Sequence, residues 1–235
     1  MSGRRALVTG ANGGLGLAIV ERLRGDGYEV VTLDVAEPAD LVVDLATGDV
    51  PSGALADIDV CVSNAGIVDI LAPAHSMSRE KWDRDLAVNL TGAFRVIQAC
   101  LPGMRERRYG RVVVMSSQAA RSGAPGQVAY CASKAGLLGM AKAIAAENVG
   151  RGITVNCVLP GLIATPKVKA MPAAILERFR AAGLLGAGRL GEPDEVAALV
   201  AYLASDAAAY VTGQEIAIAG GSDLLQVSLG SAREP

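Results

Sequence analysis

Short apolar runs alternate with longer helical patterns along this chain, and no other feature constrains its fold as strongly. The runs lack the polar alternation of a strand with one wet face, so they predict strands that are covered on both faces. Strands separated by helices pair in parallel through right-handed crossovers. We therefore expect one α/β domain over residues 1–235, with a parallel sheet between two helical layers. The predicted strands are residues 6–8, 29–33, 41–43, 58–62, 111–115, 153–158 and 215–218.

Helical patterns fill most of the gaps between these runs. Pro102 and Gly103 predict an interruption of the second helical region. The gaps 34–41 and 44–58 are short for crossover helices, so one side of the sheet should be thinly covered there. The tail is weakly patterned, and residues 230–235 are expected to be frayed. The predicted helical regions are residues 15–23, 79–107, 128–148, 172–180 and 194–203.

Charge and hydropathy exclude several classes of partner. The formal net charge is −2, and no long run of one sign occurs. A nucleic-acid surface would need more positive charge and stacking aromatics, so we expect no nucleic-acid partner and interpret the basic stretch 105–111 as a solvated helix end. No apolar run is long enough to cross a membrane, and the N-terminus lacks a convincing signal-peptide cleavage site. We expect a cytoplasmic protein with no membrane partner.

Cysteine and histidine usage argues against a metal site. The four cysteines form no Cys-x-x-Cys pair, and three of them lie in or beside apolar runs, as ordinary core thiols do. The chain has a single histidine, His75, so a histidine-rich metal site is not expected. Free core cysteines favour a reducing compartment.

A glycine-rich turn lies directly between the first predicted strand and the first predicted helix. Residues 9–16 read Thr-Gly-Ala-Asn-Gly-Gly-Leu-Gly. Gly10, Gly14 and Gly16 let the backbone turn sharply and approach a pyrophosphate, and the helix N-terminus offers it free N–H groups. This context favours nucleotide binding over a turn that binds nothing. The absence of a following Gly-Lys-Ser/Thr disfavours a P-loop nucleotidase, whereas a methyltransferase stays open on this segment alone.

Asp34 closes the second predicted strand. In dinucleotide folds a carboxylate at this place accepts hydrogen bonds from the adenosine ribose hydroxyls and would repel a 2′-phosphate. No Arg or Lys in the glycine-rich turn or just after Asp34 offsets that repulsion. We therefore predict NAD rather than NADP as the cofactor. The alternative is a strand-end carboxylate that faces solvent.

Several polar residues are candidates for chemistry. Tyr130 and Lys134 share one helix face, and a nearby ammonium lowers a tyrosine pKa, which suits the phenol to acid–base catalysis on an alcohol–ketone pair. Taken alone, such a pair is also common on helix surfaces. Ser116 and Ser117 follow a predicted strand at the sheet edge where ligands gather, so a hydroxyl there could polarise a carbonyl or cap a turn. Asn89 lies in a helix interior, where it could bond a backbone carbonyl, hold a water or be purely structural.

Together these motifs resemble the short-chain dehydrogenase/reductase family, over roughly residues 5–224. Each marker is weak alone, but their ordered co-occurrence is specific. The resemblance implies a doubly wound Rossmann-type sheet with strand order 3-2-1-4-5-6-7. It also implies a homotetramer, or a dimer, that packs the helices around Asn89 and Tyr130 across one axis. The markers are Thr9-Gly10-x-x-x-Gly14-x-Gly16, Asp44, Ser63-Asn64-Ala65-Gly66, Asn89, Ser117, Tyr130-x-x-x-Lys134, Asn156 and Pro160-Gly161.

The resemblance implies hydride transfer between a nicotinamide dinucleotide and a secondary alcohol or ketone. Ser117, rather than Ser116, would hydrogen-bond the carbonyl oxygen, and Tyr130 would exchange a proton with that oxygen. Lys134 would lower the Tyr130 pKa and bind the nicotinamide ribose. Asn89 would hold a water in a proton relay.

The same resemblance assigns the cofactor contacts along the chain. Asp44 with Leu45 would contact adenine, the segment 64–66 would line the adenosine side, and Thr165 would bond the nicotinamide carboxamide. The full set of implied contacts is Gly10, Asn12, Gly14, Leu15, Gly16, Asp34, Asp44, Leu45, Asn64, Ala65, Gly66, Tyr130, Lys134, Pro160, Gly161, Ile163 and Thr165.

Three features depart from the family pattern. Ser63 replaces the first Asn of an Asn-Asn-Ala-Gly motif, which is a small change. The short crossovers around the third strand predict a more open adenine pocket. Residues 218–221 read Ile-Ala-Gly-Gly where Val-Asp-Gly-Gly is common, which could alter a subunit contact.

Within the family the chain is most similar to 3-oxoacyl-acyl-carrier-protein reductases. Arg108 and Arg151 occupy positions where those enzymes carry basic residues for the acidic carrier protein, although both can also be ordinary exposed arginines. Asp34 argues against membership of this group of reductases, since those enzymes usually prefer NADPH. Sugar-alcohol, cyclic-alcohol and steroid dehydrogenases of the family stay open.

The apolar segment 162–190, with five basic residues interspersed, is expected to close over a small alcohol or ketone substrate. The leading hypothesis is an NAD-dependent secondary-alcohol dehydrogenase or ketone reductase. Two alternatives stay open: an NADPH-dependent 3-oxoacyl-acyl-carrier-protein reductase, and a dinucleotide sensor that has lost catalysis.

Overall fold

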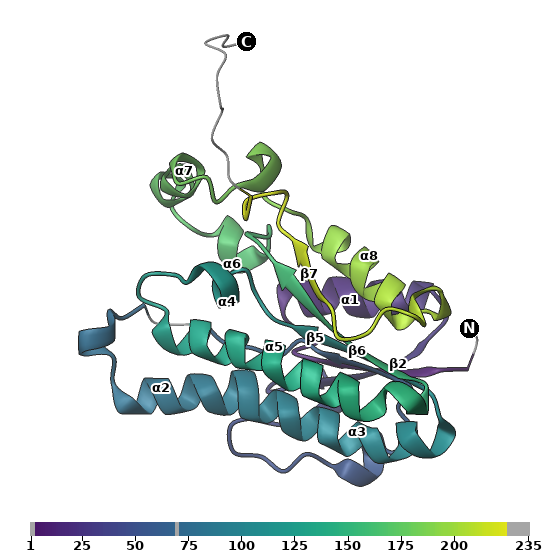
Figure 1. Ribbon diagram of the computed structural model, residues 1–235. Coiled ribbons are helices and arrows are strands. Elements are labelled where there is room, and N and C mark those ends of the chain that lie inside the picture. The colour runs from purple at the N-terminus through teal and green to yellow at the C-terminus, as the bar shows by residue number, and fades with distance from the viewer. Residues whose placement is uncertain (1–2, 69–70, 225–235) are drawn as a thin grey trace.

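Within the described residues, 3–68 and 71–224 of the computed structural model, seven strands form one parallel sheet in the order β3-β2-β1-β4-β5-β6-β7 (Figure 1). The predicted α/β fold and strand order are therefore confirmed. The tail at residues 230–235, predicted to fray, lies outside the described residues. The strands are β1 (Arg5–Thr9), β2 (Glu29–Asp34), β3 (Leu41–Val42), β4 (Val60–Ser63), β5 (Gly110–Met115), β6 (Ile153–Pro160) and β7 (Glu215–Ile218).

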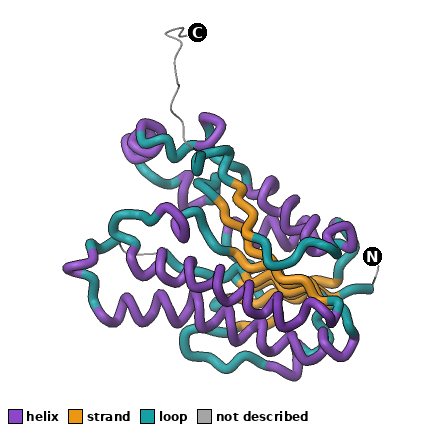
Figure 2. The backbone as a smooth tube through the Cα atoms, viewed as in Figure 1, coloured by secondary structure: helices purple, strands orange, loops and turns teal. Residues whose placement is uncertain are grey.

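The central strands are buried along their whole length. Every residue of β4, β5 and β6 is buried, as expected for apolar runs without polar alternation. Figure 2 shows why: helices lie on both sides of these strands, so neither face of the central sheet meets water. This places the chemically useful surface at the strand ends.

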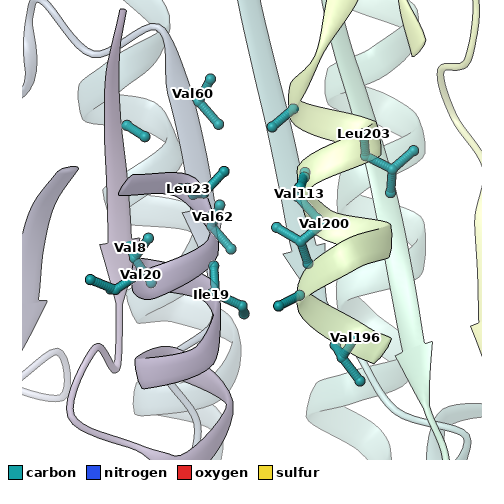
Figure 3. Close-up of a cluster of buried hydrophobic side chains, with 14 of the residues drawn as sticks. Val8, Ile19, Val20, Leu23, Val60, Val62, Val113, Val196, Val200 and Leu203 are labelled. Carbon is teal, nitrogen blue, oxygen red and sulfur yellow. The ribbon is translucent and has the colours of Figure 1, made fainter. Parts of the chain in front are cut away.

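Two hydrophobic cores flank the sheet. On one face α1 (Gly14–Gly25) and α8 (Pro193–Ala204) pack over the central strands. Figure 3 shows side chains such as Ile19 of α1 and Val200 of α8 gathered over these strands. The other face is covered by α2 (Arg79–Leu86), α3 (Ala93–Arg107) and α5 (Val128–Asn148).

The sheet is thinly covered near β3, as the sequence predicts. No helix connects β2 to β3, and only a 3-10 helix at Ser52–Leu55 lies between β3 and β4. The core on this side is completed by single residues such as Leu45 and Leu55, both of which are buried. The carboxyl edge of β2 is consequently left open to a ligand.

The predicted interruption at Pro102 and Gly103 is wrong, because α3 runs through both residues. Pro102 lies on the exposed face, where water can satisfy the carbonyl that its ring leaves without a partner. Gly103 faces inward, and a Cβ there would overlap the carbonyl oxygen of Ala56. The irregularity lies earlier instead, in a π-helical segment, Ala87–Gly92, between α2 and α3.

Three further helices lie beyond the carboxyl edge of the sheet (Figure 1). They are α4 (Ala119–Ser122), α6 (Pro166–Lys169) and α7 (Ala173–Ala181). The sequence predicts α7 within one residue at each end but not the single turns α4 and α6, which are too short to show a helical period. Across the described residues, no helix combines the length and apolar character that a membrane span requires.

Candidate active site

All residues predicted to contact the cofactor line one cleft at the carboxyl edge of the sheet, with a volume of about 930 Å³. Ser117 lines it too, whereas Asn89 does not. In open α/β sheets ligands bind at this edge, where the strand order reverses between β1 and β4. The fold thus gathers residues that are scattered over most of the chain.

The glycine-rich turn forms one wall of the cleft. Gly10 has a left-handed backbone (φ 63°), and a Cβ at Gly16 would overlap the Gly10 carbonyl oxygen. The Asn64 amide donates to the carbonyls of Thr9 (2.9 Å) and Gly10 (3.1 Å), which ties the end of β4 to the turn. The turn is therefore held in the conformation that brings bare backbone to a pyrophosphate.

The glycine-rich turn also supports α6 across the cleft. A Cβ at Gly14 would lie 2.7 Å from Pro166 Cδ and 2.9 Å from Thr165 Cβ. The Thr165 hydroxyl caps α6 by accepting from the N–H of Val168 at 3.4 Å. Because Gly14 has no side chain, Thr165 and Pro166 can pack directly against the glycine-rich turn.

Asp34 is buried in the cleft wall rather than facing solvent, with 9% of its surface exposed. Its carboxylate accepts from the N–H groups of Asn12 (2.9 Å), Val35 (2.8 Å) and Ala36 (3.3 Å). The Asn12 side chain donates in turn to the Ala36 carbonyl at 2.8 Å. A carboxylate has about four lone-pair sites, so this arrangement fixes Asp34 and leaves it acceptor capacity for ribose hydroxyls.

Asp44 and Leu45 lie at the thinly covered end of the cleft. The Asp44 carboxylate accepts from the N–H of Ala46 at 2.8 Å. The Leu45 side chain is buried in the core and packs against Gly92, where an added Cβ would lie 2.8 Å from the Leu45 Cβ. Leu45 therefore anchors this wall to the helix layer as well as lining the cleft.

Tyr130 and Lys134 project from α5 into the same cleft. The Lys134 ammonium lies 5.8 Å from the centre of the Tyr130 ring and donates to the Met115 carbonyl at 2.7 Å. Burial lowers the pKa of Lys134 to about 8. Burial also raises the pKa of Tyr130, against a smaller lowering by a hydrogen bond with Ser117.

The predicted lowering of the Tyr130 pKa by Lys134 is therefore not what this geometry produces. The ammonium is turned towards the Met115 carbonyl, and the cost of burying the phenolate outweighs the favourable contacts of the phenol. Spacing along a helix reports that two side chains share a face but not how deeply the face is buried.

The two adjacent serines have different partners. Ser117 accepts from the N–H of Ala119 at 3.2 Å, and its hydroxyl lies near enough to the Tyr130 phenol to lower the pKa of that phenol. Ser116 is buried and donates instead to the backbone carbonyl of Lys134 at 2.8 Å. Of the two hydroxyls, the one nearer the phenol belongs to Ser117, as the family resemblance implies.

Asn89 is fully buried in the π-helical segment. Its amide oxygen accepts from the N–H of Ile67 at 2.7 Å, and its nitrogen donates to the Ile67 carbonyl (3.0 Å) and to the Ser133 hydroxyl (3.2 Å). It thus bonds a backbone carbonyl, which is one of the three alternatives left open by the sequence. The water relay through Asn89 stays a prediction.

Comparison with known proteins decides the family. Residues 52–223 match the sequence profile of a family described as enoyl-(acyl carrier protein) reductase. An acetoacetyl-CoA reductase of Shinella zoogloeoides is 40% identical, over 93% of this chain and 98% of the relative. A 3-oxoacyl-[acyl-carrier-protein] reductase of Haemophilus influenzae is 37% identical, over 94% and 98%. The chain belongs to the short-chain dehydrogenase/reductase family.

A solved structure of the same fold supports this assignment. It is a protein of Agrobacterium tumefaciens described as a 2-deoxy-D-gluconate 3-dehydrogenase with bound NADP, which matches with a TM-score of 0.88 at 32% identity and covers 94% of this chain and 97% of its own. As a short-chain dehydrogenase/reductase, this chain is an NAD(P)-dependent oxidoreductase.

Sequence reasoning placed segment 162–190 on the substrate side of this dehydrogenase/reductase cleft but did not name the apolar residues that line it. Met171, Ile175 and Phe179 line it at intervals of four residues, together with Val68 and Leu71. The signal was present, because a four-residue apolar spacing predicts one helix face. Polar members of the lining that sequence reasoning missed are Arg84, Gln127 and Lys167.

Arg108 and Arg151 lie away from the cleft. They directly precede β5 and β6, so they are at the amino edge of the sheet, whereas the cleft is at the carboxyl edge. Arg108 donates to the Gly150 carbonyl at 3.0 Å. Within one chain, neither guanidinium can help to hold a substrate in the cleft.

Proposed function

We propose that this short-chain dehydrogenase/reductase transfers a hydride between NAD(H) and a ketone or secondary alcohol, with Tyr130 as the acid–base residue. The observation that carries the proposal is the shared cleft. The glycine-rich turn, Asp34, Ser117 and the Tyr130–Lys134 pair come from four parts of the chain and line one cavity. A sensor without catalysis would not need a serine hydroxyl against the phenol.

In the reduction direction each residue has a distinct role. When bound, NADH supplies the hydride for the carbonyl carbon. The Ser117 hydroxyl donates a hydrogen bond to the substrate oxygen and holds it near the phenol. Tyr130 gives its proton to that oxygen as negative charge develops there, so ketone, hydride and proton become the alcohol. The Ser117 hydroxyl is the group that favours the phenolate that remains, and the Lys134 ammonium holds the nicotinamide ribose.

Asp34 supports NAD(H) as the preferred cofactor. Its carboxylate is fixed by three backbone N–H groups at the end of β2, where the ribose hydroxyls of a dinucleotide bind. A 2′-phosphate at this place would face a buried negative charge. The Agrobacterium relative with bound NADP shows that the fold also accepts the phosphorylated cofactor, so direct comparison of the two cofactors is required.

The substrate that fits best is a short 3-oxoacyl thioester. The relatives are named for acetoacetyl-CoA and for 3-oxoacyl groups on a carrier protein, and the cleft-facing residues Met171, Ile175 and Phe179 offer an apolar wall for a short acyl chain. The segment 162–190 carries five basic residues and one acidic residue in a chain of net charge −2. This segment would close over the acyl group and present positive charge to an anionic carrier. A polyhydroxylated acid would leave its hydroxyls facing apolar side chains.

The test is turnover of matched ketones with each cofactor. Acetoacetyl-CoA, the uncharged acetoacetyl N-acetylcysteamine thioester and a 3-keto sugar acid would be assayed with NADH and with NADPH. We expect the CoA thioester with NADH to have the highest kcat/KM, and deuterium from 4-deuterated NADH to appear at C3 of the product. Binding of NADH without turnover of any ketone would favour the sensor. Clear preference for NADPH would overturn the assignment from Asp34.

A further inference from the structure

Three consecutive residues at the end of β5 hold the catalytic helix α5. The Met115 carbonyl accepts from the Lys134 ammonium at 2.7 Å. The Ser116 hydroxyl donates to the Lys134 carbonyl at 2.8 Å. The Ser117 hydroxyl lies near enough to the Tyr130 phenol to lower the pKa of that phenol. The residues at the end of β5 thus lie against the side chains of both Tyr130 and Lys134, and they also bond the backbone of α5 at Lys134.

Ser116 is the buried member of this set whose side chain touches only backbone. It is 4% exposed, and its N–H donates to the Val158 carbonyl of β6 at 2.8 Å. One residue therefore joins β5, β6 and α5. The Lys134 carbonyl lies inside a continuous α-helix and already accepts from the N–H four residues later, so α5 does not need the hydroxyl to complete its own ladder.

We propose that Ser116 is a positioning residue, whose hydroxyl fixes the register of α5 against the end of β5 so that Tyr130 and Lys134 stay aligned with Ser117. Ser116 lines the cleft, but in this role its hydroxyl acts on the Lys134 carbonyl and not on substrate or cofactor, and the role rests on the proposed function of that triad. The lysine cannot supply the same register, because its four-carbon stem lets the ammonium reach Met115 from several helix positions. A misplacement of about 1 Å at reacting groups costs on the order of 100-fold in rate.

The kinetic test compares Ser116→Ala and Ser116→Thr with the matched control Ser122→Ala. Ser122 is an exposed serine of α4 that donates only to the carbonyls of Gln118 and Gly123. We expect Ser116→Ala to lower kcat for acetoacetyl-CoA by roughly 10- to 100-fold, with the KM for NADH within twofold of wild type. Ser116→Thr keeps the hydroxyl and should recover most of kcat, and Ser122→Ala should match wild type.

A second readout does not require turnover. The absorbance of tyrosinate, titrated in the protein without cofactor and corrected by the Tyr130→Phe protein, follows the ionisation of Tyr130 alone. The groups that face this phenol are Ser117, Lys134 and Cys131. If Ser117 is no longer aligned with Tyr130, its favourable effect on the phenolate is lost. The Tyr130 phenol should therefore titrate at higher pH in Ser116→Ala than in wild type, and at the wild-type pH in Ser116→Thr.

The two readouts distinguish a failure of the proposed function from a failure of the positioning role of Ser116. Wild-type protein that reduces no ketone, but whose Tyr130 titration moves in Ser116→Ala and returns in Ser116→Thr, would refute the proposed function and keep the positioning role. Unchanged kcat and an unchanged titration in Ser116→Ala would overturn the positioning role. The positioning role would also be overturned if Ser116→Ala lowered kcat and the melting temperature together and Ser116→Thr did not restore kcat.

Discussion

Lys134 shows how burial at a single residue sets the chemistry of the cleft. With its pKa lowered to about 8 by burial, the amine is charged below pH 8 and becomes neutral as the pH rises through that value. The charged form is the one that, under the proposed function, would hold the nicotinamide ribose. Loss of activity is therefore expected on the alkaline side, well below the ordinary lysine pKa of about 10.4.

The corresponding prediction concerns kcat/KM for NADH, which reports the ionisation of the free enzyme. It should be constant near neutral pH and fall with an apparent pKa of about 8. The Lys142→Arg protein should give the same curve, because Lys142 pairs with Glu215 outside the cleft. A kcat/KM that holds constant to pH 10 would show that Lys134 is not the titrating group.

Asp34 supports a second residue-scale prediction, on cofactor preference. Asp34→Ser removes the buried charge that opposes a 2′-phosphate, so the ratio of the Kd values for NADPH and NADH should fall by at least about tenfold. Fluorescence titration of both cofactors measures it. Asp49→Ser is the control, because that carboxylate is fully exposed and outside the cleft. An equal loss of affinity for both cofactors in Asp34→Ser would instead assign Asp34 a purely structural role.

The candidate site could be located from sequence because its residues carry local signals. Glycines between a strand and a helix, a carboxylate at a strand end and a Tyr–Lys pair on one helix face each have a physical reason to be where they are. What the sequence could not show depends on tertiary burial. The raised pKa of Tyr130 depends on burial by the surrounding fold, and the bonds from Asn89 join it to Ile67, which is 22 positions away in the sequence.

At the scale of elements, α1 provides a matched pair of glycines. A Cβ at Gly16 would overlap the Gly10 carbonyl oxygen, whereas nothing lies within 4 Å of a Cβ at Gly25. Gly16→Ala should therefore weaken NADH binding by more than about tenfold by displacing the turn from the pyrophosphate, and Gly25→Ala should bind as wild type does. Calorimetric titration with NADH measures both. Equal affinities in the two proteins would mean that the turn does not hold the cofactor.

The helix α7 supports a prediction about substrate closure. Phe179→Ser removes an apolar side chain from the cleft, so the KM for acetoacetyl-CoA should rise by about 10-fold, as expected from the loss of one buried aromatic contact. Leu184→Ser is the control, because Leu184 is exposed and does not line the cleft. Kinetics at saturating NADH separate the two. The closing role of segment 162–190 would be contradicted if Phe179→Ser left KM unchanged.

The sequence predicts elements well where a period can be read over many residues and poorly where it cannot. The predicted helix 128–148 matches α5 at both ends, because its pattern is long. The break expected at Pro102 does not occur, because that residue faces water and its neighbour Gly103 fits against Ala56. The segment 87–92 adopts a π-helix, a form that frequently accompanies functional sites and has no simple sequence period.

At the scale of the whole molecule, the edge of the sheet opposite the cleft is held by a polar cluster. The Tyr109 ring lies between the guanidinium groups of Arg4 (4.0 Å) and Arg111 (4.5 Å). Arg111 is buried and donates to the carbonyls of Gly152 and Ser205. The cluster joins the start of β1, the start of β5 and the end of α8, and none of it lines the cleft.

This separation predicts that stability and cofactor binding can be changed independently. Arg111→Met removes a buried guanidinium that donates to the part-buried carbonyls of Gly152 and Ser205, so it should cost about 2 kcal/mol and lower the melting temperature by about 5 °C. The Kd for NADH should stay within twofold of wild type. The exposed i,i+4 pair of Arg22 with Asp26 gives the control, since Arg22→Met should change little. A melting temperature unaffected by Arg111→Met would show that the cluster does not hold this edge.

The assembly and the cytoplasmic location stay predictions. Light scattering on the eluted protein distinguishes the expected homotetramer from a dimer or a monomer.

Proton exchange by the Tyr130 hydroxyl is tested by comparing the wild-type protein with the Tyr130→Phe protein. Tyr130→Phe removes a single oxygen and leaves the ring in place. We expect this protein to bind NADH with the affinity of wild type and to reduce acetoacetyl-CoA at least about 100-fold more slowly, because a positioned general acid typically contributes that much. Full turnover by the phenylalanine protein would contradict this expectation.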